Sequence, residues 1–393
     1  MNVNTKSLDG FRFLLALWVC MGHFYLIIGG NKFFSIPVLS KLFLTPIHAV
    51  DGFMIITGFL MTYHYFLREK KEPFTSFSTG LIFIMRRLFR LYPVYIIAII
   101  AAFFLVNTMY DIRKDVLIYF TDSSLTVWGK ESKVEDPTLL GLFSHLLFVH
   151  GLVPGEDSSI LSVAWSLSLE MQFYVLFPLI FLFLFGNSNP KRIFLTTIVM
   201  VIISTISLRY YNLFYDMPAV LIFKFPLFLL GMLMAAVGLG KIKLKQFLFS
   251  GLIILLFQSK ETILVALLLN LFLFLDNFKP FTNNKLFGFI DVFRGILSSR
   301  VAKFGADISY SLYLFHLITL PFILKFYISM ELNRYQTAAF SYATFIIINF
   351  SLSYIVHVLI EKPFIKLGKN VIRKIGFIGQ KKNEKYKNTH KVS

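Results

Sequence analysis

The first apolar segment of the chain contains two residues capable of acid–base and anion chemistry, Arg12 and His23. They are eleven residues apart, so at about 100° per residue they return to nearly one face of a helix, separated by about 16 Å of rise. An imidazole has an unperturbed pKa of about 6.5, which suits a general base near neutral pH. A lone buried histidine is more often structural than catalytic, and the arginine on the same stripe brings these two interpretations into balance.

Asp51 lies at the start of the next apolar segment, in the stretch His48-Ala-Val-Asp-Gly-Phe. Two antiparallel helices would place Asp51 at a depth comparable with His23. A carboxylate hydrogen-bonded to one imidazole nitrogen fixes the tautomer and leaves the other nitrogen free as a base. The alternative is that Asp51 caps a helix start that faces the headgroups. Asp51 is therefore a candidate catalytic residue together with Arg12 and His23.

Three arginines, Arg86, Arg87 and Arg90, lie at the start of the third apolar segment, before Pro93. Guanidinium groups bind phosphate oxygens bidentately, so this cluster suits a ligand that carries phosphate groups. Topological anchoring at a membrane surface is the competing explanation.

Further polar side chains interrupt the later apolar segments. Ionisable groups inside a bilayer cost roughly 2.5–3.5 kcal/mol on insertion scales, so each implies a partner or a function. Glu170 is interpreted as a catalytic carboxylate, and five other residues are assigned to substrate binding: Trp165, Gln172, Lys224, Tyr313 and His316. Interhelical hydrogen bonds would explain any one of them, but a shared polar cavity explains all of them together. No set of histidines and carboxylates has the spacing of metal ligands, so no metal site is predicted.

These residues lie in a chain of 393 residues that is 56% apolar, with 47 phenylalanines and a mean hydropathy of +0.71. Repeated apolar runs of this length indicate an all-α, polytopic transmembrane helical bundle in a lipid bilayer. Ten spans are predicted, at residues 8–29, 46–66, 87–107, 167–186, 193–209, 219–238, 245–258, 262–276, 306–328 and 338–360. The pair within 245–276 is the weakest of these because each run is short.

The charges predict how the bundle is oriented and divided. Most Lys and Arg residues fall between alternate spans or in the tail at 365–393, whereas the segment 108–160 is acidic. The positive-inside rule then places both termini in the cytosol and the segment 108–160 outside. We therefore predict one transmembrane domain at 1–364 and a basic cytosolic tail. The formal net charge of +18 does not indicate nucleic-acid binding, because the basic residues do not form a continuous binding face.

Six motifs, in order from residue 7 to residue 364, resemble the acyltransferase family 3 proteins, which are bacterial inner-membrane enzymes that move acetyl and other acyl groups onto sugars. The motifs are Ser7-Leu-Asp-Gly-Phe-Arg12 with His23, Val50-Asp-Gly-Phe with Thr57-Gly-Phe-Leu, Arg87-Leu-Phe-Arg90-Leu-Tyr-Pro93, Trp165-Ser-Leu-Ser-Leu-Glu170-Met-Gln172, Ile308–His316, and Glu361-Lys-Pro363. Thr57 stands where the family usually has Ser, and Met171 where it has a second Glu.

The resemblance implies an acyl-coenzyme A donor, acetyl-CoA above all, that enters from the cytosol with Arg87 and Arg90 near its phosphates. It also implies that Arg12 and His23 are central to transfer and that the acceptor is a hydroxyl of a surface polysaccharide or lipid-linked sugar. No permanently bound cofactor is expected, and the oligomeric state is not predicted. Two mechanisms stay open: His23 deprotonates the acceptor directly, or an acyl-histidine relays the group outward.

Two other classes of function are compatible with a polar path inside a membrane. A transporter or flippase of glycan intermediates would explain the buried charges but not the order of the motifs, and the chain shows no internal repeat. A catalytically silent sugar-binding membrane protein is the third hypothesis. The single cysteine, Cys20, excludes an internal disulfide.

Overall fold

The computed structural model describes residues 3–35, 37–124, 137–186, 189–278 and 284–374, and these residues form helices and connecting turns without a strand. This confirms the all-helical prediction for the described part of the chain. The principal helices are α1 (Ser7–Ile27), α2 (Pro37–Phe43), α3 (Ile47–Arg68), α4 (Phe77–Thr121), α5 (Leu139–Leu146), α6 (Trp165–Phe185), α7 (Pro190–Tyr210), α8 (Leu221–Gly238), α9 (Leu244–Leu256), α10 (Lys260–Phe278), α11 (Asn284–Leu297), α12 (Arg300–Ile328) and α13 (Arg334–Val356).

Five short turns complete the described chain. Four are 3-10 turns: η1 (Gly30–Lys32), η2 (His150–Leu152), η3 (Ser162–Ala164) and η4 (Tyr211–Leu213). The fifth, η6 (His357–Glu361), is a π-helical turn that continues α13, and the helix runs on to Lys374. A π-helical turn inside an α-helix is rare and frequently marks a functional site.

Local sequence signals set several helix boundaries. Ser299 accepts a hydrogen bond from the Ala302 amide at the start of α12. Asn333 and Gln336 form a capping box at the start of α13. α7 begins with Pro190 directly after the cap Asn189, the position at which a missing N–H costs nothing. α1 ends at Ile27, and Gly29 two residues later has a φ of 93°, which lies in the left-handed region that glycine adopts without strain.

Seven helices of the described chain are long and apolar enough to cross a membrane: α1, α4, α6, α7, α8, α12 and the continuous helix Arg334–Lys374. Many of their large apolar side chains point outward, such as Phe104, Leu179 and Leu195. Such an apolar exterior suits lipid. α3, α9 and α10 coincide with the other three predicted spans but are not among these seven, so the count of ten and the orientation of the termini stay predictions.

α4 differs from the predicted element. It is one helix of 45 residues, at about 1.5 Å per residue longer than a bilayer core is thick, so its ends project beyond any single span. Residues 108–121, expected to begin the acidic loop, continue this helix instead. Polar residues such as Asp111 and Asp115 ended the apolar run without ending the helix.

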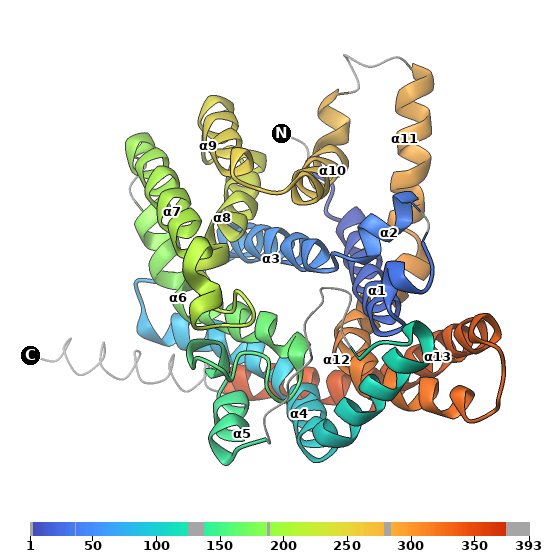
Figure 1. Cartoon of the computed structure of the whole chain (residues 1–393). Helices are drawn as coiled ribbons and strands as arrows, with labels where there is room; N and C mark the ends of the chain where they lie inside the picture. The colour runs from blue at the N-terminus through green and yellow to red at the C-terminus, as the bar shows by residue number, and fades with distance from the viewer. Residues whose placement is uncertain (1–2, 36, 125–136, 187–188, 279–283, 375–393) are drawn as a thin grey trace, which may run out of the picture.

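α8 is the most deeply buried of the candidate spans, and α3 packs closely along it. In Figure 1, α3 lies between α8 and α1, while α4, α12 and α13 form the group below it. Gly58 of α3 and Gly231 of α8 have no side chain at this contact, which lets the two backbones approach closely. Another face of α3 points into the space that α3 shares with α4, α6 and α12.

Candidate active site

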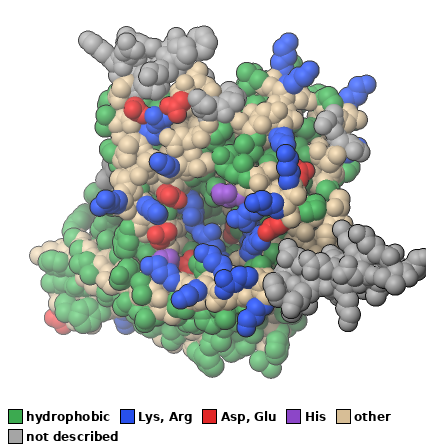
Figure 2. Space-filling view, turned by 180° about the vertical axis from the view of Figure 1, so that it is seen from behind, with side chains coloured by type: hydrophobic (Ala, Val, Ile, Leu, Met, Phe, Trp, Pro, Cys, Tyr) green, Lys and Arg blue, Asp and Glu red, His purple; other side chains and the backbone are tan. Residues whose placement is uncertain are grey.

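A cavity of about 1430 Å³ opens between α3, α4, α6, α12 and the helix that continues α13. Eight basic residues line it against four acidic ones. The basic residues are Arg12, Arg68, Lys71, Arg86, Arg87, Arg90, Lys369 and Arg373, and the acidic residues are Glu72, Glu170, Asp307 and Glu361. Figure 2 shows Lys and Arg side chains gathered around the middle of one hollowed face of the molecule, with Asp and Glu side chains between them. The cavity therefore favours an anionic ligand.

Two of the predicted basic residues lie in this cavity without a partner in the described part of the chain. Arg12 of α1 and Arg90 of α4 make no hydrogen bond or ion pair to any described residue. The charges near Arg12 include Arg90 and Glu170. Because a guanidinium has five donors and no acceptor, an unpaired one that faces a cavity is suited to an incoming anion.

The other two arginines of the predicted cluster are occupied. Arg86 donates to both carboxylate oxygens of Glu72, with 2.6 Å between Nη1 and Oε2. This hydrogen bond lowers the pKa of Glu72, which lies between α3 and α4. Arg87 donates to the Phe83 carbonyl at 3.2 Å and to the Met61 sulfur at 2.9 Å. Arg90 is thus the member of the cluster that is free for a ligand.

Glu170 faces the cavity from the second turn of α6. The Thr57 hydroxyl of α3 donates to Glu170 Oε1 at 3.0 Å, and the Tyr174 hydroxyl donates to the same oxygen. Thr57 and Tyr174 also line the cavity. The predicted catalytic carboxylate is therefore inside the cavity, held by two hydroxyl groups.

Tyr313 of α12 also lines the cavity. Its hydroxyl donates to the Val163 carbonyl at 2.9 Å and lies 2.7 Å from the Ser166 hydroxyl. Its ring packs edge-on against Phe53, and both residues line the cavity. The assignment of Tyr313 to this cavity thus agrees with the structure, whereas a role in substrate binding stays a prediction.

His23 and His316 form a pair next to Tyr313 but are not among the residues that line the cavity. His316 Nε2 lies 2.9 Å from His23 Nδ1, and His316 Nδ1 lies 2.7 Å from the Tyr313 carbonyl oxygen. His316 is fully buried, whereas His23 is partly exposed. α1 therefore contributes Arg12 to the cavity wall and His23 to the histidine pair.

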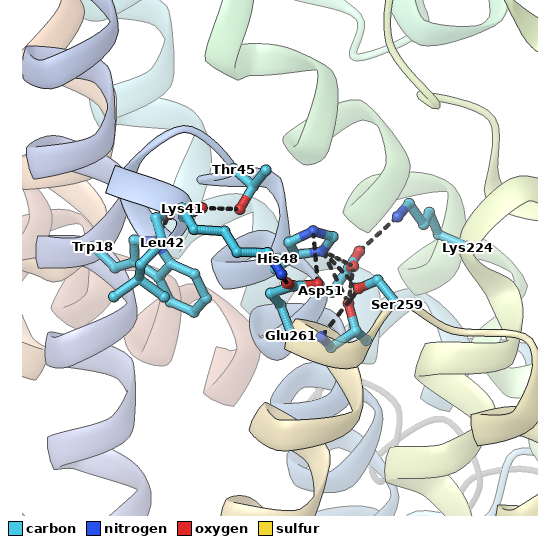
Figure 3. A network of polar contacts seen from close by, with 10 residues as sticks. Trp18, Lys41, Leu42, Thr45, His48, Asp51, Lys224, Ser259 and Glu261 are labelled. Atoms are coloured by element: carbon cyan, nitrogen blue, oxygen red, sulfur yellow. Dashed lines mark hydrogen bonds and ion pairs between the residues drawn. The ribbon is translucent and has the colours of Figure 1, made fainter. Parts of the chain in front are cut away.

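The expected pairing of Asp51 with His23 is wrong. Asp51 Oδ1 accepts from Lys224 Nζ at 2.7 Å, and Asp51 Oδ2 accepts from the Thr262 hydroxyl at 2.7 Å and lies 3.4 Å from His48 Nδ1. Figure 3 shows His48 and Asp51 of α3 beside Lys224 of α8 and close to Ser259 and Glu261 at the start of α10. Antiparallel packing predicts the depth of a residue along its helix, but not which neighbouring helix its side chain meets. Asp51 and Lys224 therefore satisfy each other, and neither lines the cavity.

Gln172 and Trp165 also lie outside the cavity lining. Gln172 donates to the Ala219 carbonyl at 2.9 Å and accepts from the Leu221 amide at 2.9 Å, so it ties α6 to the start of α8. Trp165 begins α6 and is buried in the apolar core. Both side chains hold α6 in place, and the structure gives them no contact with the cavity.

The sequence reasoning missed one stripe of the cavity wall. His357, Glu361, Ile365, Lys369 and Arg373 all line it, at intervals of four residues along one helix face. His357 Nδ1 lies 2.8 Å from Glu361 Oε2. The four-residue repeat was a readable signal, since residues at i and i+4 share one face. It was hidden because Lys369 and Arg373 were attributed to a solvated tail.

Comparison with known proteins agrees with these observations. Residues 5–358 match the sequence profile of acyltransferase family 3, which is described as an acyltransferase domain. No curated protein and no solved structure matched the chain. The match covers nearly the whole described chain, so the protein belongs to this acyltransferase family. With its seven candidate spans, it is a multi-pass membrane acyltransferase.

Proposed function

We propose that this protein is an O-acyltransferase that moves an acyl group, typically acetyl, from acyl-coenzyme A to a hydroxyl of a surface polysaccharide or a lipid-linked sugar. The observation that carries this proposal is the cavity of about 1430 Å³, in which eight basic residues face four acidic ones in a member of an acyltransferase family. Coenzyme A carries a pyrophosphate and a ribose phosphate at one end and a thioester on a long flexible arm at the other.

The distribution of side chains in the cavity suits such a donor. Arg90, Arg68 and Lys369 offer cations for the phosphates, and Arg90 has no competing partner among the described residues. The wall also contains apolar side chains such as Met54, Ile56 and Leu60, which suit the pantetheine arm. Tyr313, which is next to the histidine pair, and Phe53, which packs on Tyr313, would then lie near the thioester.

The transfer itself needs a base and a site for the acceptor. In the direct mechanism, His23 removes the proton from the acceptor hydroxyl while its oxygen bonds to the thioester carbonyl carbon. The carbon–sulfur bond breaks, and the coenzyme A thiolate takes up a proton to leave as the thiol. A positioned base typically contributes about 10²–10⁴-fold to the rate. Because His23 is outside the cavity lining and partly exposed, we place the acceptor on its side of Tyr313.

The proposal is tested with the purified full-length chain in lipid nanodiscs. Labelled acetyl-coenzyme A is supplied with glycan and lipid-linked sugar fractions, and label that leaves the coenzyme is measured. We expect transfer to a sugar hydroxyl that is lost on His23→Ala, while the variant still inserts and binds donor. Label that stays on the coenzyme with every fraction would contradict the proposal. Movement of a fluorescent lipid-linked sugar across vesicles without acyl-coenzyme A would support the flippase alternative instead.

The cellular setting is part of the same proposal. We place the protein in a bacterial cytoplasmic (inner) membrane with both termini in the cytosol, because the donor is a cytosolic metabolite. Mass spectrometry of cell-surface glycans, with and without the protein, identifies the acceptor. An unchanged glycan profile would contradict an acceptor at the cell surface.

A further inference from the structure

The histidine pair next to Tyr313 contains a directional chain of hydrogen bonds. His316 Nδ1 lies 2.7 Å from the backbone carbonyl oxygen of Tyr313. A carbonyl oxygen can only accept, so the proton of this hydrogen bond belongs to His316 Nδ1. In neutral His316, Nε2 then carries no proton and is an acceptor.

The second hydrogen bond determines which nitrogen of His23 carries the proton. His316 Nε2 lies 2.9 Å from His23 Nδ1, and two unprotonated nitrogens would repel each other at that distance. Because His316 Nε2 accepts, His23 Nδ1 must donate. Neutral His23 therefore carries its proton on Nδ1 and leaves Nε2 as the unprotonated nitrogen.

The remaining nitrogen is open to a reactant. No described residue forms a hydrogen bond with His23 Nε2, and this atom is not among the buried polar atoms that lack a partner. The buried ring of His316 stacks on that of His23 at an interplanar angle of 30°, with 5.0 Å between ring centroids. The centroid of the Tyr313 ring lies 6.1 Å from that of His316. Packing thus fixes the orientation of the pair as well as its protonation.

We propose that His316 is a positioning residue that sets the tautomer of His23, so that His23 Nε2 is the atom that reacts. This inference rests on the proposed function, in which His23 acts in acyl transfer. It applies to both mechanisms, because Nε2 is the free nitrogen whether His23 takes a proton or carries the acyl group. When His23 takes up a proton at Nε2, the Nδ1–H bond to His316 persists, and the chain ending at the Tyr313 carbonyl stabilises the imidazolium.

Nitrogen NMR of the wild-type chain reads the tautomer directly. The protein is labelled with ¹⁵N-histidine in nanodiscs at neutral pH, and the His23 signals are assigned as those lost in His23→Asn. We expect His23 Nδ1 to be protonated and Nε2 unprotonated. A proton on His23 Nε2 in the neutral ring would overturn the proposal. The spectrum does not depend on turnover, so an inactive wild-type protein with this tautomer would count against the proposed function alone.

Kinetics of two variants test the consequence for catalysis. His316→Phe keeps a planar ring but removes the acceptor, whereas His316→Gln offers a side-chain oxygen near the position of Nε2. We expect His316→Phe to lower kcat by about 10²–10⁴-fold, with little change in KM for acyl-coenzyme A, because the chemical step is affected and donor binding is not. His316→Gln should recover at least about tenfold of that loss. Equal rates for the two variants, with insertion intact in both, would overturn the role of the acceptor nitrogen.

Discussion

The hydroxyl of Thr57 donates a hydrogen bond to Glu170 Oε1 across 3.0 Å, joining α3 to α6 inside the cavity. Tyr174 donates to the same oxygen, so one oxygen of the carboxylate is held by two hydroxyls. Oε2 has no hydrogen-bond partner among the described residues and is not buried. Glu170 therefore presents one fixed, unpaired oxygen to a ligand in the cavity.

This geometry predicts graded effects at Thr57. Thr57→Val removes the donor and should lower kcat about tenfold, because a hydrogen bond to a charged group contributes about 1.5–3 kcal/mol. Thr57→Ser keeps the hydroxyl and is the matched control, with near wild-type activity expected. Glu170→Gln should lose about 10²-fold or more if the charge is needed. The measurement is steady-state acyl transfer, and equal activity of Thr57→Val and Thr57→Ser would contradict a role for this contact.

Arg90 and Arg86 should respond differently to neutralisation, although both line the cavity. Arg90 has no described partner, so Arg90→Gln should raise KM for acyl-coenzyme A about 10- to 100-fold through loss of a charge-assisted contact. Arg86 is occupied by Glu72, so Arg86→Gln should change that KM only slightly. Donor titrations at two salt concentrations check both variants. A larger effect at Arg86 would mean that Glu72 releases its partner when the donor binds.

The sequence predicted helices well because their signals are local. Apolar runs, helix caps and positive φ at glycine act within a few residues, so every predicted span coincides with a helix of the structure. α4 is the main difference, because the polar residues after 107 lie on a helix that continues past the apolar run.

The partners of buried charges were harder to predict, because they depend on how helices rotate against one another. His23 was expected to meet Asp51, but α12 brings His316 to it instead, while α8 and α10 bring Lys224 and Thr262 to Asp51. The position of a residue along its helix follows from its residue number. Which neighbouring helix its side chain meets does not, because that depends on how the helices are rotated. Glu170 does line the cavity, as its polarity in an apolar helix suggested, whereas Gln172, placed there by the same argument, does not.

Asp51 and Lys224 form a buried ion pair, so we expect single variants at these positions to lose much more stability than the double variant. The two side chains are 2% and 12% exposed, so Asp51→Ala leaves an uncompensated cation and should cost about 3–5 kcal/mol of stability. Asp51→Leu combined with Lys224→Met removes both charges and should recover most of that loss. Thermal unfolding in nanodiscs measures stability, and acyl transfer is assayed in parallel. A double variant that is stable but inactive would support a catalytic role for Asp51.

Asp157, in the segment before α6 and outside the spans, predicts a dependence of stability on pH. Burial, with Asp216 nearby, raises its pKa to about 6, although the Met217 amide donates to Asp157 Oδ2 at 2.6 Å. A raised pKa means that the folded state favours the protonated form. Its contribution is therefore complete below the unfolded pKa of about 3.8 and is lost as the pH rises through about 6.

The measurement compares hydrogen exchange of residues 150–164 in the wild type and Asp157→Asn at pH 5 and pH 7.5. The variant should gain protection relative to the wild type at both pH values, and more at pH 7.5 than at pH 5, because the contribution is lost across the interval from about 3.8 to about 6. Burial lowers the pKa of His145 to about 4, which destabilises the same region as the pH falls below about 6.5, so the difference between the two proteins is the informative quantity. If the difference in protection between the variant and the wild type were the same at both pH values, the ionisation state of Asp157 would not change between them, contrary to a pKa of about 6.

Gly58, next to Thr57, lies at the close contact between α3 and α8. We predict that the site is active only when these two helices pack this closely. A Cβ at Gly58 would lie 2.1 Å from the Phe228 backbone oxygen, so Gly58→Ala must push the two helices apart. Overpacking of this kind costs typically about 1–3 kcal/mol, and here it would also displace the Thr57 hydroxyl from Glu170. Gly80 of α4 is the matched control, because nothing lies within 4 Å of its added Cβ, and Ala there should be neutral or stabilising by up to about 1 kcal/mol. Thermal unfolding and acyl transfer are measured for both variants, so that lost stability and altered geometry can be told apart. We expect Gly58→Ala to lose activity even below its unfolding temperature. Full activity at that temperature would mean that α3 can shift without disturbing Glu170.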